Sequence, residues 1–216
     1  QFYKKDKNTL VLKKGTHTFH NTVIIPTGLS LVIEPGAHLY FAPRVSLISY
    51  SPVTAVGAKQ QPIIFAPLYP EKEPWGSFAV INTGSEKSRF QYLHISGGSS
   101  DFINGTVLNG QFSLNNADAN IQNSTFENAH ADDSVNIILG SAVIQQNTFK
   151  NNASDGIDLD YAYDATLEEN IFLNHGGDAI DLSGNRKTLI KNNIIVDCKD
   201  KGISVGERSY PIIKNN

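Results

Sequence analysis

Apolar residues recur at intervals of 23 residues through the second half of the chain. Between them lie short segments that alternate apolar and polar residues, such as Ile157-Asp158-Leu159-Asp160, separated by Asn, Gly, Asp and Ser. This alternation is typical of β-strands, and no segment has a convincing helical period. The apolar columns are Ile121, Ile144, Leu167, Ile190 and Ile213; Phe126, Phe149, Phe172 and Ile195; and the pairs Ile157 and Leu159, Ile180 and Leu182, and Ile203 and Val205.

A period of 23 residues fits either a leucine-rich repeat or a β-solenoid. The chain has no ladder of leucines in an L-x-x-L-x-L frame, so we predict an all-β parallel β-helix in which each repeat forms one coil. Stacked coils place equivalent residues about 4.8 Å apart and bury them in one continuous core. We predict a single domain over 1–216 of roughly nine coils, with an irregular N-terminal cap and entry coils over 1–90 and regular coils over 91–216.

Asparagine is concentrated in the same half, since 18 of the 21 asparagines lie from Asn104 onward and two columns keep the repeat. The amide side chain donates and accepts hydrogen bonds, and asparagine tolerates left-handed turn dihedrals. We therefore interpret the two columns as structural ladders and not as substrate contacts. They are Asn147, Asn170, Asn193 and Asn216, and Asn128, Asn151, Asn174 and Asp197.

Two insertions interrupt the coils of the first half. The segment Phe90–Ile95 matches 121–126 at an offset of 31 residues, which places about eight surplus residues near Gly97–Thr106. A second loop, Pro67–Pro74, contains three prolines that prevent continuation of a strand ladder. Such loops often border binding sites, and Tyr69 could stack on a sugar. Trp75, which follows the loop, has packing and ligand stacking as its two interpretations.

Several segments resemble the right-handed parallel β-helix proteins of the pectin-lyase-like superfamily, especially bacterial secreted and surface members. The similar segments are IEPGAHLYF, QPIIFAP and WGSF in the entry coils and SDGIDLDYA and GGDAIDLSGN in the later coils. The resemblance implies a right-handed solenoid. It leaves the reaction open, because this superfamily includes lyases, hydrolases, epimerases and non-catalytic adhesion or spacer domains.

Net charge and the length of apolar runs argue against two classes of partner, nucleic acids and membranes. Eighteen Lys and Arg against 21 Asp and Glu give a net charge of -3, which argues against nucleic-acid binding. No apolar run approaches the roughly 20 residues of a membrane span, so we predict no membrane insertion. The single cysteine, Cys198, has no partner for an internal disulfide. Asn216 and Ile213 fall early in a new coil, so we expect the chain to continue in a longer protein, and no oligomeric state is predicted.

Acidic residues gather between Asp155 and Asn185, where eight carboxylates occur without a Lys or Arg. Asp158 and Asp181 lie between inward apolar residues and should stack on the outer surface, where their charges repel. We consider three interpretations: a solvated acidic face in which Asp132, Asp155 and Asp178 accept turn N–H bonds, a calcium site at Asp158 and Asp181 that helps bind an acidic polysaccharide, and a glycoside-hydrolase or lyase-type centre.

Catalysis would depend on Asp158, Asp181 and His175. The residues that would contact the glycan are Asp155, Asp160, Asp178, Tyr161, Tyr163 and Tyr69, and the nearest cations in the sequence are Arg186 and Lys187. Motifs of enzymatic relatives, such as Asp-Pro-His and Gly-His-Gly, are absent. His175 shares a column with Asn152 and Cys198, which favours a turn position.

We therefore expect a secreted or cell-surface module that binds polysaccharide or serves as a rigid structural element, with the periplasm as an alternative location. The alternative function is a polysaccharide lyase, epimerase or glycoside hydrolase that acts on an acidic glycan. Calcium is the one cofactor that the acidic segment suggests.

Overall fold

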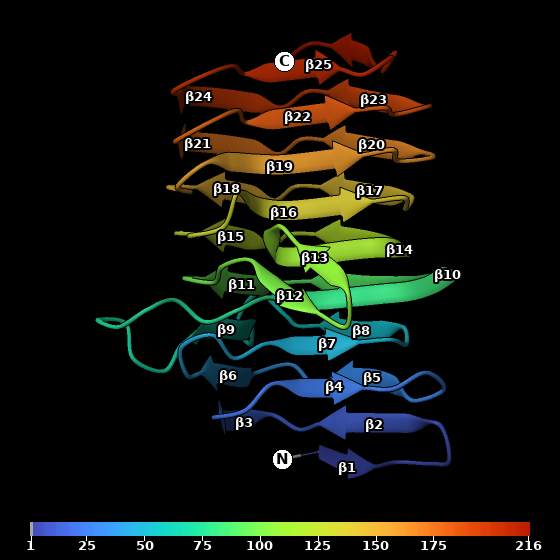
Figure 1. Cartoon of the computed structure of the whole chain (residues 1–216), viewed down its shortest axis with the longest axis vertical. Helices are drawn as coiled ribbons and strands as arrows, with labels where there is room; N and C mark the ends of the chain where they lie inside the picture. Colours follow the sequence, from blue (N-terminus) through green and yellow to red (C-terminus); the bar gives the residue numbers. More distant parts are fainter. Residues whose placement is uncertain (1) are drawn as a thin grey trace.

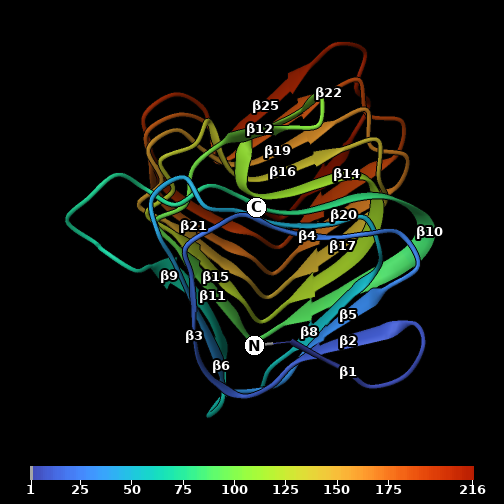
Figure 2. The same ribbon diagram turned by 60° about the horizontal axis from the view of Figure 1, so that its bottom comes forward.

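The computed structural model describes residues 2–216 and confirms the right-handed parallel β-helix. The coils stack along the long axis of the molecule, with the two ends of the chain at opposite ends of the stack (Figure 1). Regular coils contribute three strands each, and these strands form three faces around the core (Figure 2). No helix within residues 2–216 is long and apolar enough to cross a membrane.

The first face contains the strands that open each regular coil. They are β4 (Val23–Ile25), β7 (Leu47–Ser49), the first part of β10 (Phe78–Gln91), the first part of β14 (Gly110–Gln122), β16 (Asp133–Ile138), β19 (Asp155–Asp160), β22 (Ile180–Ser183) and β25 (Ile203–Gly206). Neighbouring strands are parallel throughout this face.

The second face follows in each coil and includes the distal parts of β10 and β14. Its other strands are β2 (Thr9–Leu12), β5 (Ser30–Ile33), β8 (Val53–Val56), β17 (Ala142–Gln145), β20 (Ala165–Glu168), β23 (Thr188–Lys191) and β26 (Ile212–Lys214). The short strand β1 (Phe2–Lys4) pairs antiparallel with β2 at the N-terminal end.

The third face closes each coil. Its strands are β3 (Gly15–Phe19), β6 (Ala37–Phe41), β9 (Ile63–Pro67), β11 (Leu93–Ser96), β15 (Thr125–Glu127), β18 (Thr148–Lys150), β21 (Ile171–His175) and β24 (Ile194–Cys198). The residues between the third face of one coil and the first face of the next form turns, which we call the corner turns.

The predicted columns are confirmed by the strand register, although their last members, Val205 and Ile213, are about half exposed. Ile121, Ile144 and Leu167 are paired from coil to coil and are fully buried. Phenylalanine rings stack through most of the molecule, and the ring centroids of Phe149 and Phe172 are 4.6 Å apart. No single coil could bury these side chains alone, so the stack itself supplies the hydrophobic stabilisation.

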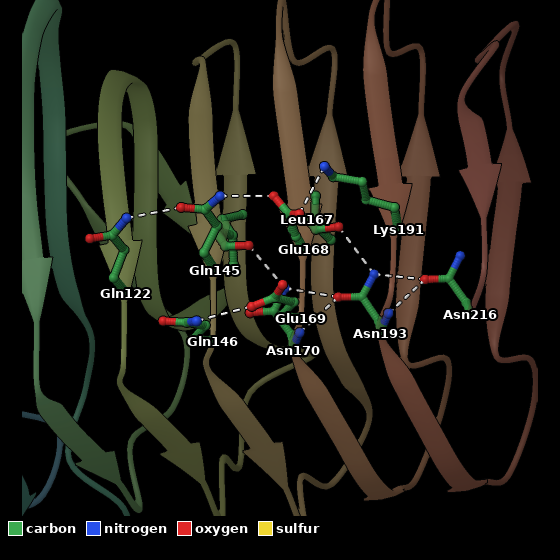
Figure 3. Close-up of polar contacts among 11 residues, drawn as sticks. Gln122, Gln145, Gln146, Leu167, Glu168, Glu169, Asn170, Lys191, Asn193 and Asn216 are labelled. Carbon is green, nitrogen blue, oxygen red and sulfur yellow. Dashed lines mark hydrogen bonds and ion pairs between the residues drawn. The ribbon is translucent and has the colours of Figure 1, made fainter.

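The predicted asparagine ladder is also confirmed. Asn170 donates from Nδ2 to Asn193 Oδ1, and Asn193 donates in the same way to Asn216 (Figure 3). A parallel ladder runs from Gln122 through Gln145 to Glu168, which pairs with Lys191 at 2.8 Å. The other asparagine column occupies left-handed turn positions, with φ near 55° at Asn151.

Both predicted insertions are corner turns. The matched segments pair as expected, because Phe90 stands opposite Ile121. The surplus residues form an antiparallel hairpin of β12 (Asp101–Ile103) and β13 (Thr106–Leu108). Leu108 packs on Ile48, Ala79 and Ile81, so the hairpin covers the outer side of the first face near its middle. The proline-rich loop projects from the corner beside β9 (Figures 1 and 2).

Candidate functional site

The outward side chains of the first face change from apolar to acidic along the solenoid. One outward column runs from Ile48 and Ala79 under the hairpin to Asp158 and Asp181 near the C-terminal end. Asp160 lies in the next outward column. We call the acidic region of β16, β19, β22 and their corner turns the aspartate patch; it consists of Asp133, Asp155, Asp158, Asp160, Asp178 and Asp181.

Asp155 and Asp178 cap the backbone of the following coil. Asp155 Oδ1 accepts the Asp178 N–H at 2.7 Å, and Asp178 Oδ1 accepts the Lys201 N–H at 2.6 Å. A Cβ atom on Gly177 would lie 2.0 Å from Asp155 Oδ1, so only glycine admits the carboxylate there. The expected turn hydrogen bonds are thus confirmed for these two aspartates.

Asp132 does not belong to that column. The structure pairs Asp133 with Asp155, because the corner turn after Ala129 has one more residue than the turn after Asn152. The assignment of Asp132 was therefore wrong by one position. A strict 23-residue count misses such single-residue insertions in turns, where they cost the strand ladder nothing.

Three carboxylates of the patch converge. Oxygens of Asp155, Asp178 and Asp181 lie within 4.8 Å of one another. Oδ1 of each accepts a backbone N–H, from Asp178, Lys201 and Leu182 respectively, while Oδ2 of each has no hydrogen bond within residues 2–216. Calcium binds oxygens at about 2.3–2.6 Å, so ligands of one ion lie within about 5 Å of each other. The geometry of these three residues fits a calcium ion, and the group includes Asp181 but not Asp158.

Asp133 pairs with Asp155 on the neighbouring strand and adds a fourth carboxyl group to this region. Its side chain is only 4% exposed, and its carboxylate accepts no hydrogen bond from residues 2–216. Burial, and next the negative charge of Asp155, raise the pKa of Asp133 to about 8. A buried carboxylate without a donor is expensive to ionise, and a nearby cation would relieve that cost.

Asp158 points outward but is only partly accessible. Its Oδ2 accepts a hydrogen bond from Asn136 Nδ2 at 3.3 Å, whereas no N–H or hydroxyl group reaches Oδ1. Burial, and next the charge of Asp133, raise the pKa of Asp158 to about 9. Asp158 also contacts Asp160. A carboxyl group can donate a hydrogen bond to another carboxylate only when it is protonated, so protonated Asp158 is the donor in this contact.

The cation nearest the patch is Lys201, not Arg186 or Lys187. Lys201 Nζ lies 3.5 Å from Asp178 Oδ1. Lys187 instead pairs with Asp164, and Arg186 lies 5.7 Å from the ring centroid of Tyr163. Sequence distance suggested the wrong lysine because the next coil, more than 20 residues away in the chain, stacks directly on the patch.

His175 is an interior residue and not the expected turn residue. It lies in β21 with 0% exposure, and its Nδ1 is 3.4 Å from Asn152 Nδ2 while Nε2 has no partner within the described chain. Burial lowers the pKa of His175 to about 4, so the ring is neutral at pH 7. Cys198 stands opposite it in the next coil, and burial raises the pKa of that thiol, which makes it a poor nucleophile.

The tyrosines named from the sequence lie at the margins of the first face. Tyr161 is 50% exposed and donates its hydroxyl to Glu207. Tyr163 contacts Arg186, and Tyr69 lies on the proline-rich loop with Lys72 Nζ 4.4 Å from its ring centroid. Trp75 has 0% exposure and stacks on Phe41, so its packing interpretation is confirmed.

Sequence reasoning missed Asp133 and Lys201. Asp133 falls outside the acidic segment in the sequence, yet it is brought under the segment by strand pairing. The doublet Gly176-Gly177 before Asp178 was a usable signal, because a Cβ on Gly176 would lie 1.8 Å from the carbonyl oxygen of Ala153. This contact is between two backbones, so the doublet marks the place where the corner turns of neighbouring coils approach each other closely.

Comparison with known proteins identifies the repeat. Residues 109–216 match the family model described as the right handed beta helix region. The chain can also be aligned with the A-module of a mannuronan C-5 epimerase from Azotobacter vinelandii, over 97% of this chain and 91% of that one, at 9% identity and a TM-score of 0.26. No curated protein matches the sequence.

Proposed function

The chain belongs to the right handed beta helix family, and we propose that its aspartate patch binds a calcium ion and, through it, an acidic polysaccharide. The observation that carries this proposal is the convergence of Asp155, Asp178 and Asp181 within 4.8 Å. Their free Oδ2 atoms would hold the ion, and the regular outer surface would lie along the glycan.

The ion would reverse the electrostatics of the patch. Without it, an anionic sugar would meet several carboxylates and one lysine, Lys201. When bound, calcium supplies a positive charge that attracts the sugar carboxylate and lowers the pKa values of neighbouring acids. Lys201 would add a second positive group at the same edge. A role on polysaccharides also places the protein outside the cell or on its surface in this proposal.

Calcium titration by calorimetry tests the proposal directly. The wild-type protein should bind one calcium ion, and Asp155→Asn and Asp178→Asn should each weaken binding by about tenfold or more because each loses a charged ligand. Asparagine keeps an oxygen that can accept the backbone N–H. Asp164→Asn is the matched control, since Asp164 is exposed and pairs with Lys187 away from the patch.

The polysaccharide is tested next with polygalacturonate and alginate in co-sedimentation. Binding should require calcium, disappear with a chelator and be lost in Asp178→Asn. Calcium binding without retention of either polymer would reject the glycan part, and equal calcium affinity in the wild type and both patch variants would reject the site. Calcium should also raise the melting temperature of the wild type, since it binds only the folded arrangement.

Hydrolysis of a glycan is the second candidate, favoured by the burial that raises the pKa of Asp158 to about 9. In glycoside hydrolases a carboxylic acid with a raised pKa protonates the leaving oxygen, and a second carboxyl group acts as nucleophile or base. Asp158 and Asp181 are paired on adjacent strands. Release of reducing ends that is abolished by Asp158→Asn, with calcium affinity retained, would favour this function over binding alone.

A further inference from the structure

The corner turns of three successive coils enclose a cavity of about 310 Å³ on the N-terminal side of the aspartate patch. One wall is the end of the proline-rich loop, at Glu73 and Pro74, and the opposite wall is Ser99-Ser100-Asp101 at the start of the hairpin insertion. Arg44 completes the rim from the preceding coil. We call this cavity the loop pocket. It lies between the two insertions that the sequence singled out.

We propose that the loop pocket binds one unit of a neutral saccharide, independently of the aspartate patch. Small-ligand sites usually occupy about 300–1,000 Å³ and carry a few polar groups that converge on the ligand. The loop pocket is at the lower end of this range, so it suits a single sugar ring. Its lining is about half polar and half apolar, as the faces of a sugar ring are.

The pocket is rigid because the three turns are hydrogen-bonded to each other. The Arg44 N–H donates to the Pro74 carbonyl at 3.0 Å, the Gly76 N–H to the Val45 carbonyl at 3.0 Å, and the Ser99 N–H to the Gly76 carbonyl at 2.8 Å. Below them Trp75 is fully buried and its Nε1 donates to the Ser96 carbonyl. A preformed site loses little conformational entropy when a ligand binds.

The free polar groups of the pocket are the hydroxyls of Ser99 and Ser100. Neither hydroxyl has a hydrogen-bond partner within residues 2–216, and both can donate and accept. Asp101 is already occupied, since Oδ1 accepts the Phe102 N–H and Oδ2 accepts the Ser46 hydroxyl. A ligand in this pocket therefore meets two adjacent hydroxyl groups beside fixed charges.

The charges of the rim favour a neutral ligand. Arg44 makes two contacts with Glu73, at 2.8 and 3.1 Å, so the charge of Glu73 offsets its positive charge. Asp101 then leaves the pocket with a negative excess, which repels an anionic sugar. An apolar ligand would bury the serine hydroxyls without partners. A ring that bears several neutral hydroxyl groups satisfies both conditions, because it is uncharged and can exchange hydrogen bonds with the serines.

The test is a titration of the full 216-residue chain, followed by ¹H–¹⁵N spectra, with cellohexaose, laminarihexaose and mannohexaose in the presence of a calcium chelator. At least one of these neutral probes should shift the amide signals of Gly76, Ser99 and Ser100. The double variant S99A/S100A should weaken that binding by about tenfold, because both free hydroxyls are lost. Ser85→Ala is the matched control, since Ser85 is an exposed serine away from the pocket.

Trigalacturonate serves as the anionic probe and should leave the loop signals unchanged. Because the chelator removes calcium, this result does not depend on the aspartate patch. The loop pocket can therefore be confirmed or rejected whether or not the patch binds calcium. Ser100→Tyr, which fills the cavity, should abolish binding while Trp75 fluorescence remains that of the folded protein. The proposal is overturned if no neutral probe shifts the loop signals, if S99A/S100A binds as tightly as the wild type, or if only trigalacturonate binds.

Discussion

Replacement of Asn170 by alanine should remove one rung of the interior ladder and destabilise the coils on both sides. Asn170 is fully buried. Its Oδ1 accepts hydrogen bonds from both the backbone N–H and the Nδ2 of Asn147, at 3.0 Å each, and its Nδ2 donates to the Ile144 carbonyl at 2.9 Å and to Asn193 Oδ1 at 3.0 Å.

The magnitude follows from the group that would lose its partner. After Asn170→Ala the Asn147 N–H lacks the side chain that now pairs with it. The Ile144 carbonyl keeps its place in the ladder between β17 and β20, Asn147 Nδ2 keeps the Ile121 carbonyl, and Asn193 Oδ1 keeps the Asn170 N–H. A buried unpaired group costs about 1–3 kcal/mol, so the predicted loss of stability is about 1–3 kcal/mol.

The assay must report on individual coils, because solenoids unfold by segments and Trp75 lies several coils away. Native-state hydrogen exchange supplies this resolution, and the amides of Asn147 and Ile171 should lose protection in Asn170→Ala. The control is Asn174→Gly, which removes an exposed ladder bond to Asn151 at a residue with φ of 56° that glycine accommodates. The loss of stability in Asn174→Gly should stay below about 1 kcal/mol. Equal losses in the two variants would refute the view that burial makes the interior ladder important.

Other perturbations test the core, the acidic residues and the glycine contact. Leu167→Ala should cost about 2–5 kcal/mol in urea unfolding, because the stacked coils cannot close around the vacancy; a loss under about 1 kcal/mol would contradict the observed register. Because the pKa of Asp133 is raised from 3.8 to about 8, the folded protein keeps a proton that the unfolded chain has lost between these pH values. The free energy of unfolding should therefore decline as pH rises through that interval, by up to about 1.4 kcal/mol per pH unit. Asp133→Asn should make the decline between pH 6.5 and 8 smaller. The pKa of His175 is lowered to about 4, so stability should also fall as pH drops from 6.5 through 4, and an acid limb unchanged in His175→Gln would exclude this cause. Gly177→Ala should displace Asp155 and weaken calcium binding, whereas unaltered affinity would separate the patch from that contact.

The aspartate patch is a strong candidate for a binding site because two of its carboxyl groups reduce the stability of the fold when they are ionised. Asp133 and Asp158 are held where ionisation is costly, and asparagine at either position would fold with less repulsion. Structural needs explain Asp155 and Asp178, since both accept backbone N–H groups. They do not explain Asp133, whose carboxylate accepts none from residues 2–216. A cation held by Asp155, Asp178 and Asp181 would lower the cost of a negative charge on the neighbouring Asp133.

The sequence by itself determined the fold, because a parallel β-helix repeats the same environment in every coil. Each apolar column and each asparagine column samples that environment several times, so the period and the inward or outward direction of residues such as Ile144 and Asp181 follow from one-dimensional patterning. The pairing of Phe90 with Ile121 across an insertion was recoverable for the same reason.

The tertiary structure alone decided which residues of different coils share a site. Contacts in the patch run between coils, so one extra residue in a corner turn replaces Asp132 by Asp133 and stacking of the next coil brings in Lys201 instead of Lys187. Irregular turns have no repeat from which their geometry can be averaged, which is why the pocket formed by Arg44 and the two insertions was not visible in the sequence. The interior position of His175 was likewise decided by packing, because a residue at the end of a strand can turn toward either side.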